Sequence, residues 1–80
     1  MNDLKKIMSE NIKAIRNSSF KSQRGFAETI GFTAAAVSRW ERGYVLPHVE
    51  ALWQMSQVFE IPIECFFEDG GVKCHIQKKS

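Results

Sequence analysis

The chain has 80 residues, a net charge of +2, 44% hydrophobic residues and 25% charged residues, which is the make-up of one ordinary globular domain. No apolar run reaches the roughly 20 residues of a membrane span, and the charged start MNDLKKIMSENIKAIRN lacks a signal-peptide core, so we expect an intracellular protein without a membrane partner. Two cysteines are too few for a disulfide framework and lack the spacing of a zinc site, so we expect reduced thiols, no metal and no cofactor.

The first predicted element is an α-helix over residues 4–17. Its apolar residues recur at helical spacing, at Leu4, Ile7, Met8, Ile12 and Ile15. This spacing places them in one stripe along the helix, which we expect to face the core. Asp3 is the candidate N-cap, and the turn-forming cluster Asn17-Ser18-Ser19 ends the helix.

Residues 23–43, QRGFAETIGFTAAAVSRWERG, predict two short helices that meet at a tight turn. Ser22 can cap the first helix and Thr33 the second, because their hydroxyl oxygens accept hydrogen bonds from free backbone N–H groups. Gly31 separates the two helices, since glycine enters the left-handed conformation without a steric penalty. A short helix, a glycine turn and a second helix form the layout of a helix-turn-helix, whose second helix lies in the DNA major groove.

A fourth helix is predicted over residues 48–60 and a short fifth helix over residues 61–67. The fourth carries apolar residues at helical spacing, namely Val49, Leu52, Met55, Val58 and Phe59. In the fifth, Pro62 suits the first turn, and three side chains are expected to fill the core: Ile63, Phe66 and Phe67. Trp53 lies beside the apolar stripe of the fourth helix, where it is either half-buried or exposed as a subunit contact.

Residues 70–80 form a tail whose pattern differs from that of residues 1–69. After a turn signal at Asp69-Gly70-Gly71, apolar and polar residues alternate from Val72 to Gln77. This period of two predicts a short β-strand. One strand cannot satisfy its edges inside a helical domain, so we expect the tail either to be disordered or to pair with the same strand of a second copy.

Charge is distributed unevenly along the chain. Residues 1–48 carry eight Lys or Arg against four acids, residues 49–69 carry five acids and no Lys or Arg, and residues 70–80 carry three lysines. A protein polarised in this way can offer one face to phosphates and keep the other face away from them. A mixed, solvated surface is the alternative that would hold without the helix-turn-helix pattern.

The chain from Met8 to Glu68 resembles the λ-repressor-like helix-turn-helix domains of phage repressors and Cro, also called the XRE family. The resemblance rests on residues and segments that stand in the family's order: Gln23, Ala27, Gly31, Val37, the ending SRWERG at 38–43, the helix after Pro47 and the closing segment 63–67. It implies a compact all-α domain of five helices over residues 1–69, with the helix-turn-helix formed by the second and third helices.

The resemblance also implies a function. Similar domains bind double-stranded DNA sequence-specifically, so we expect a transcriptional regulator, more specifically a repressor that acts as a homodimer on a near-palindromic operator. It would be encoded by a bacterium or a phage and act in the cytoplasm. The alternative is an antitoxin-type module that binds a partner protein as well as its own promoter. No nucleophile is assembled with a base and an orienting group, so no enzymatic activity is expected.

The resemblance further implies roles for single residues. Base-reading residues are expected on the exposed face near the start of the third helix: Thr33, Ala34, Ala35, Ser38 and Arg39. Phosphate-binding residues are expected at the start of the second helix and after the third: Ser22, Gln23, Arg24, Arg42, Gly43 and Tyr44. Arg16 and Glu41 stand where similar domains have a buried ion pair. Arg16 could instead point outward to phosphate, and Tyr44 could equally be a packing residue.

The expected base-reading face is chemically sparse. Ala34 and Ala35 can only touch thymine methyl groups or let the helix sit deeper in the groove. Arg39 is the one strong candidate for a bidentate contact with guanine, worth roughly 1–3 kcal/mol of discrimination, and a phosphate contact is its alternative. So few readers suggest modest specificity, recognition of DNA shape, or help from a second subunit.

Overall fold

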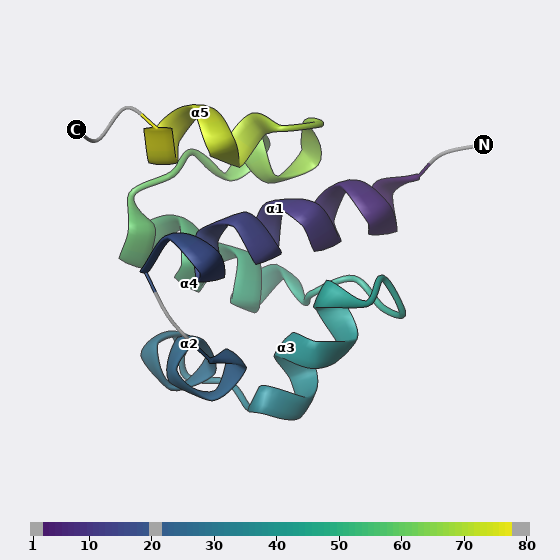
Figure 1. Ribbon diagram of the computed structural model, residues 1–80, viewed down its shortest axis with the longest axis vertical. Helices are drawn as coiled ribbons and strands as arrows, with labels where there is room; N and C mark the ends of the chain where they lie inside the picture. The colour runs from purple at the N-terminus through teal and green to yellow at the C-terminus, as the bar shows by residue number, and fades with distance from the viewer. Residues whose placement is uncertain (1–2, 20–21, 78–80) are drawn as a thin grey trace.

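The structure, a computed structural model that describes residues 3–19 and 22–77, is built from helices (Figure 1). In chain order these are α1 (Leu4–Ser19), α2 (Gln23–Ile30), α3 (Ala34–Glu41), α4 (Val49–Phe59), the 3₁₀ helix η1 (Ile63–Phe67) and α5 (Gly71–Gln77). The predicted all-α class is confirmed, with η1 in the place of the predicted fifth helix. No helix within the described ranges is long and apolar enough to cross a membrane.

The core forms around α1, which lies between α5 on one side and α3 on the other (Figure 1). Three residues of its predicted stripe are buried, namely Met8, Ile12 and Ile15, and Leu4 and Ile7 lie half-buried at its N-terminal end. The other helices and the connection between α4 and η1 add buried side chains to the same core: Phe26, Ala27, Ile30, Val37, Trp40, Ala51, Leu52, Met55, Ile61, Phe66 and Val72. Burial of these apolar side chains is the main force that holds the helices together.

The caps and the turn of the helix-turn-helix follow the sequence prediction. The Ser22 hydroxyl accepts a hydrogen bond from the Gly25 N–H at 3.1 Å, and the Thr33 hydroxyl accepts one from the Ala36 N–H at 3.1 Å. Gly31 ends α2 with φ +82°, in the left-handed region that favours glycine. These local interactions fix where α2 stops and α3 starts, and so set the direction in which α3 leaves the turn.

The prediction for α4 and η1 was only partly right. Phe66 is fully buried, but Ile63 and Phe67 are 36% and 44% exposed, so the prediction that they fill the core was wrong. Val49 and Val58 of α4 are exposed as well. A helix buries only the face that meets another element. The elements that contact α4 most are α2 and η1, and the outer face of the helix, with Val49 and Val58, stays exposed.

The strand predicted near the C-terminus was wrong, and so was the alternative of disorder over residues 71–77. This segment is helix α5, which packs against α1 and η1. Val72 is fully buried and Ile76 packs against the core. The two residues are four positions apart, a separation that puts them on one face of a helix as well as on one face of a strand. The last tail residues, 78–80, lie outside the described residues.

Gly71 allows α5 to approach η1 closely. A Cβ atom at this position would lie 2.3 Å from the carbonyl oxygen of Cys65, which is backbone and cannot move aside. Any other residue would therefore push the start of α5 away from η1.

Asn11 is the polar link between α1 and the C-terminal elements. Its Nδ2 lies 2.9 Å from the carbonyl oxygen of Glu68, 3.0 Å from that of Phe66 and 3.3 Å from that of Cys65. Its Oδ1 accepts a hydrogen bond from the Val72 N–H at 3.5 Å. Asn11 is 1% exposed, so water has little access to these carbonyl groups. The Asn11 side chain supplies the hydrogen bonds that water would otherwise make to them.

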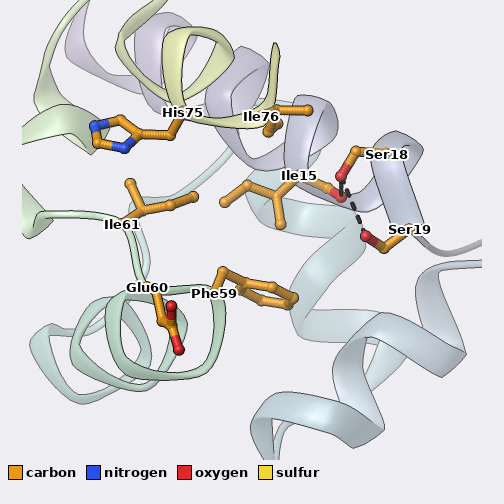
Figure 2. A pocket seen from close by; sticks show the side chains of 8 residues that line it. All are labelled: Ile15, Ser18, Ser19, Phe59, Glu60, Ile61, His75 and Ile76. Atoms are coloured by element: carbon orange, nitrogen blue, oxygen red, sulfur yellow. Dashed lines mark hydrogen bonds between the residues drawn. The ribbon is translucent and has the colours of Figure 1, made fainter. Parts of the chain in front are cut away.

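A hollow lies where the end of α1 meets α5 and the turn after α4 (Figure 2). Its wall is formed by apolar side chains, namely Ile15, Phe59, Ile61 and Ile76. On its rim, Ser18 donates a hydrogen bond to the Ile15 carbonyl at 2.7 Å, within the last turn of α1. Figure 2 shows the Glu60 carboxylate pointing away from Ile15 and Ile76. The hollow is thus a notch at a helix junction that polar residues, namely Ser18, Ser19, Glu60 and His75, line together with the apolar ones.

Candidate nucleic-acid interface

Helix α3 lies at the edge of the molecule opposite α5 (Figure 1). One face of α3 carries Val37, Trp40 and Glu41 into the interior, while Ala35 and Arg39 are exposed. The edge-to-face contact of Trp40 with Phe32, at 5.6 Å between ring centroids, adds to the packing beside the turn. The helix therefore has a fixed inner face and a free outer face.

The five predicted base-reading residues differ in how far they reach the surface. Ala35 and Arg39 are four positions apart and form an exposed row, whereas Ala34 and Ser38 form a parallel row that is half-buried. Thr33 is exposed, but its oxygen already caps α3, which leaves the hydroxyl proton free to donate. No ion pair within the described residues holds Arg39. Its guanidinium is thus the strongest hydrogen-bond donor on this face.

The start of α2 has free backbone donors. Ser22 satisfies the Gly25 N–H, but the N–H groups of Gln23 and Arg24 lie in the first turn, where a helix supplies no acceptor. Such a turn attracts anions. The Gln23 side chain is directed inward, since its Nε2 donates to Glu41 Oε1 at 3.1 Å. The Arg24 side chain is 81% exposed and pairs with Glu28 at 3.2 Å.

The turn after α3 carries the other predicted phosphate-binding residues. Arg42 is exposed, and its guanidinium carbon lies 5.8 Å from the centre of the Tyr44 ring. Tyr44 is 62% exposed, so it packs against this arginine and not in the core. Gly43 has φ +75°, which turns the chain so that the Tyr44 N–H donates to the Arg39 carbonyl at 3.0 Å. This hydrogen bond joins the turn to the last residues of α3.

The structure brings Arg16 and Glu41 together as an ion pair. Arg16 Nε lies 2.6 Å from Glu41 Oε2 and Nη2 lies 3.0 Å from Oε1, a bidentate geometry. The Glu41 side chain is 4% exposed and that of Arg16 18%. The hydrogen bond to Glu41 raises the pKa of Arg16 above its ordinary value, against the opposing effect of burial. With Gln23 on the same carboxylate, Glu41 connects α1, α2 and α3.

Residues 12–64, about two thirds of the chain, match the helix-turn-helix family model of the Cro/C1 type. The chain belongs to the XRE family. At the level of this family, the protein is a DNA-binding transcription regulator, and its ligand is double-stranded DNA. Comparisons with curated proteins and with solved structures return no significant match.

Two lysines that the sequence interpretation did not assign lie beside the end of α3 in this XRE-family domain. Lys5 and Lys6 line one hollow together with Arg42 and Gly43, and Asp3 lies at the same place. The Lys5 carbonyl would be 3.9 Å from a Cβ atom at Gly43, so the start of α1 and the turn after α3 are in contact. In the sequence, the adjacent lysines are the one feature that points to this basic site. Their position relative to α3 depends on how α1 packs, so the sequence does not show it.

The histidines and cysteines do not gather into a larger cluster among the described residues. Cys65 Sγ and His75 Nε2 lie 3.3 Å apart, between η1 and α5. Among the side chains that the structure describes, which do not include that of Cys74, no three His, Cys, Asp or Glu side chains are placed to hold a metal ion.

Proposed function

We propose that this regulator is a repressor that binds a near-palindromic operator as a homodimer, encoded by a bacterium or phage and active in the cytoplasm. The observation that carries the proposal is the exposed row of Ala35 and Arg39 on α3. With one strong hydrogen-bonding side chain per copy, a single α3 distinguishes few base pairs. Two copies whose recognition helices lie about 34 Å apart on one DNA face would double the contacts.

In this proposal α3 reads bases through unlike groups. Arg39 forms a bidentate contact with the O6 and N7 atoms of a guanine, and Thr33 donates its free hydroxyl proton to an acceptor at a base edge. Ala34 and Ala35 contact thymine methyl groups, and the Ser38 hydroxyl hydrogen-bonds to a base edge. The absence of side-chain atoms beyond Cβ at the two alanines lets the helix sit deep in the groove.

Phosphates are held on both sides of this reading face. The first turn of α2 offers the N–H groups of Gln23 and Arg24, next to the Ser22 cap, to one phosphate. The turn after α3 offers Arg42 with its neighbours Gly43 and Tyr44 to another phosphate. These contacts position α3 but carry no sequence information.

The test is selection of bound sequences from random DNA duplexes, followed by titration of the selected duplex at increasing salt. We expect two inverted half-sites about ten base pairs apart, centre to centre. If Arg24 and Arg42 of both copies contact phosphates, the logarithm of the binding constant should fall against the logarithm of salt with a slope of roughly −4. A single half-site, or binding that does not change with salt, would contradict the homodimer or the phosphate contacts.

Replacing Arg39 with alanine should mainly reduce the preference for the selected operator. We expect the discrimination against a duplex with the contacted guanine changed to fall by roughly 1–3 kcal/mol for each half-site. The matched control is Arg42→Ala, which should weaken binding to all duplexes equally and make the salt slope shallower by about one per copy. Equal losses on all duplexes for Arg39→Ala would instead assign Arg39 to phosphate.

An antitoxin-type module, which binds a partner protein as well as its own promoter, is a second candidate. It is favoured by one observation, the exposed apolar residues Trp53 and Ile63 on the acidic part of the chain. A second polypeptide that co-purifies in a fixed ratio, encoded next to this gene, would support it. The repressor proposal requires no such partner.

A further inference from the structure

Three apolar side chains on α4 and η1, outside the recognition helix α3, are exposed. Val49 is 79% exposed, Trp53 52% and Ile63 36%. We call these three residues the α4–η1 patch. Val49 and Trp53 are four positions apart, so they lie one above the other on α4. Exposed tryptophan is unusual without a partner, since burial of its ring is strongly favourable.

The patch is hollowed between its two elements. Trp53 and Ile63 line one concave site, and Gln57 and Pro62 complete its sides. A concave apolar site beside a tryptophan has the shape that receives an inserted apolar side chain. The structure thus has an exposed Val49 one helical turn before Trp53 and a shallow apolar hollow beside the Trp53 side chain.

The rim of the patch is acidic. Glu50 is three positions before Trp53 on α4, Glu60 lines the hollow itself, and Glu64 follows Ile63 on η1. All three side chains are exposed, and neither ion pair of the described residues involves them. Figure 2 shows the Glu60 carboxylate directed away from Ile15 and Ile76. Residues 49–69 contain no Lys or Arg that would neutralise these acids.

This charge decides between possible occupants. Nucleic acid and anionic membrane surfaces would be repelled by the rim. A second copy joined patch to patch by a two-fold axis would bring two sets of the same three glutamates together, and like charges across an interface disfavour association. A protein segment with basic residues around an apolar side chain matches both the hollow and the rim.

We propose that the α4–η1 patch binds a basic protein segment, whose apolar side chain enters the hollow beside Trp53 and whose Lys or Arg residues pair with Glu50, Glu60 and Glu64. The proposal does not rest on operator binding, because the recognition helix α3 contributes no residue to the patch. A partner could therefore occupy the patch while α3 remains available to DNA.

The probes are two synthetic amphipathic helical peptides with the same leucine stripe, one with lysines and one with glutamates at all other positions. The lysine peptide should bind the full chain at least about tenfold more tightly than the glutamate peptide. It should also shift tryptophan emission to shorter wavelength, because Trp53 is exposed whereas Trp40 is 4% exposed and already shielded. Equal affinity for the two peptides would overturn the proposal.

Variants locate the binding. Trp53→Lys should weaken binding of the lysine peptide about tenfold or more, as measured by calorimetry. The matched control Val58→Lys adds the same charge to a side chain that is 42% exposed on α4 but five positions away, and it should weaken binding much less. Glu64→Lys should also weaken binding, with circular dichroism unchanged for all three variants. Equal losses for Trp53→Lys and Val58→Lys would sink the proposal.

Analytical sedimentation distinguishes the two possible occupants of the patch, a second copy of this chain and a basic partner. If the wild-type chain is a dimer and Trp53→Lys makes it a monomer, the patch is a self-interface and the proposal is overturned. If Trp53→Lys leaves both the oligomeric state and operator binding unchanged, the result supports the proposal of a basic partner. If the wild-type chain binds the lysine peptide but selects no operator, the result would count against the repressor proposal alone.

Discussion

Replacing Arg16 with methionine should lower the free energy of unfolding by roughly 3–5 kcal/mol. The substitution leaves the Glu41 carboxylate with a side-chain exposure of 4%, and only the Gln23 amide would still donate to it. A buried charge without its counter-ion keeps the cost of desolvation and loses the attraction that offset it. Urea denaturation followed by circular dichroism measures the change. Since small domains have a total stability of about 5–15 kcal/mol, the effect should be large.

The chain offers a matched control in its other ion pair. Arg24→Met breaks the contact with Glu28, whose partners have side-chain exposures of 81% and 67%, and no measurable change in stability is expected. Adding Glu41→Leu to Arg16→Met should restore much of the loss, because it removes the stranded carboxylate. Similar, small effects of Arg16→Met and Arg24→Met would show that the buried pair does not hold the fold.

The same ion pair should matter for DNA binding. Glu41 is the last residue of α3 and accepts hydrogen bonds from side chains of α1 and α2, so its loss should loosen the position of the recognition helix. Operator affinity should therefore fall in Arg16→Met even at temperatures at which the variant is still folded.

Replacing Asn11 with aspartate should destabilise the protein by at least about 3 kcal/mol at neutral pH. The substitution removes the amide donor and puts a carboxylate oxygen against three carbonyl oxygens that now lie 2.9–3.3 Å from Nδ2. The site is 1% exposed, so water cannot compensate. Because α1 would repel η1 and the start of α5, the two C-terminal elements should lose protection from hydrogen exchange before the rest of the domain.

The pH dependence of this variant provides a separate check. The folded state binds a proton at position 11 more readily than the unfolded state, since a neutral carboxyl group can donate one hydrogen bond to the carbonyls. The loss of stability relative to wild type should therefore be largest at neutral pH and shrink as the pH falls towards the ordinary aspartate pKa of about 4. Asn17→Asp, an exposed change on the same helix, is the control and should behave like wild type. A deficit that does not change with pH would contradict the role assigned to Asn11.

The apolar pattern of residues 72–77 shows why a β-strand was predicted where the structure has helix α5. Val72 and Ile76 are compatible with both a strand and a helix, because a separation of four residues repeats in each. The choice was made by contacts with residues outside the segment: the Asn11 Oδ1 accepts a hydrogen bond from the Val72 N–H, and Gly71 fits against the Cys65 carbonyl. No pattern within residues 70–77 contains that information.

The same reason explains the side chains whose burial was mispredicted. Val49 and Phe67 follow apolar spacing as closely as Met55 and Phe66 do, yet they are exposed. Spacing identifies which side of a helix is apolar, but whether another element covers that side depends on the arrangement of all the helices. The sequence could not place Lys5 and Lys6 beside Gly43 for the same reason. Their position next to the candidate nucleic-acid interface results from the packing of α1 against α3.

By itself, the sequence determined the helices of residues 4–67, their caps at Ser22 and Thr33, the turn at Gly31 and the family. These features rest on hydrogen bonds and periodicity within a few residues, which a single segment contains. Tertiary structure alone decided that residues 71–77 are a helix, that Asn11 joins α1 to it, and that Trp53 and Ile63 share an open surface. Each of these depends on contacts between different helices, and only the folded arrangement of the helices specifies them.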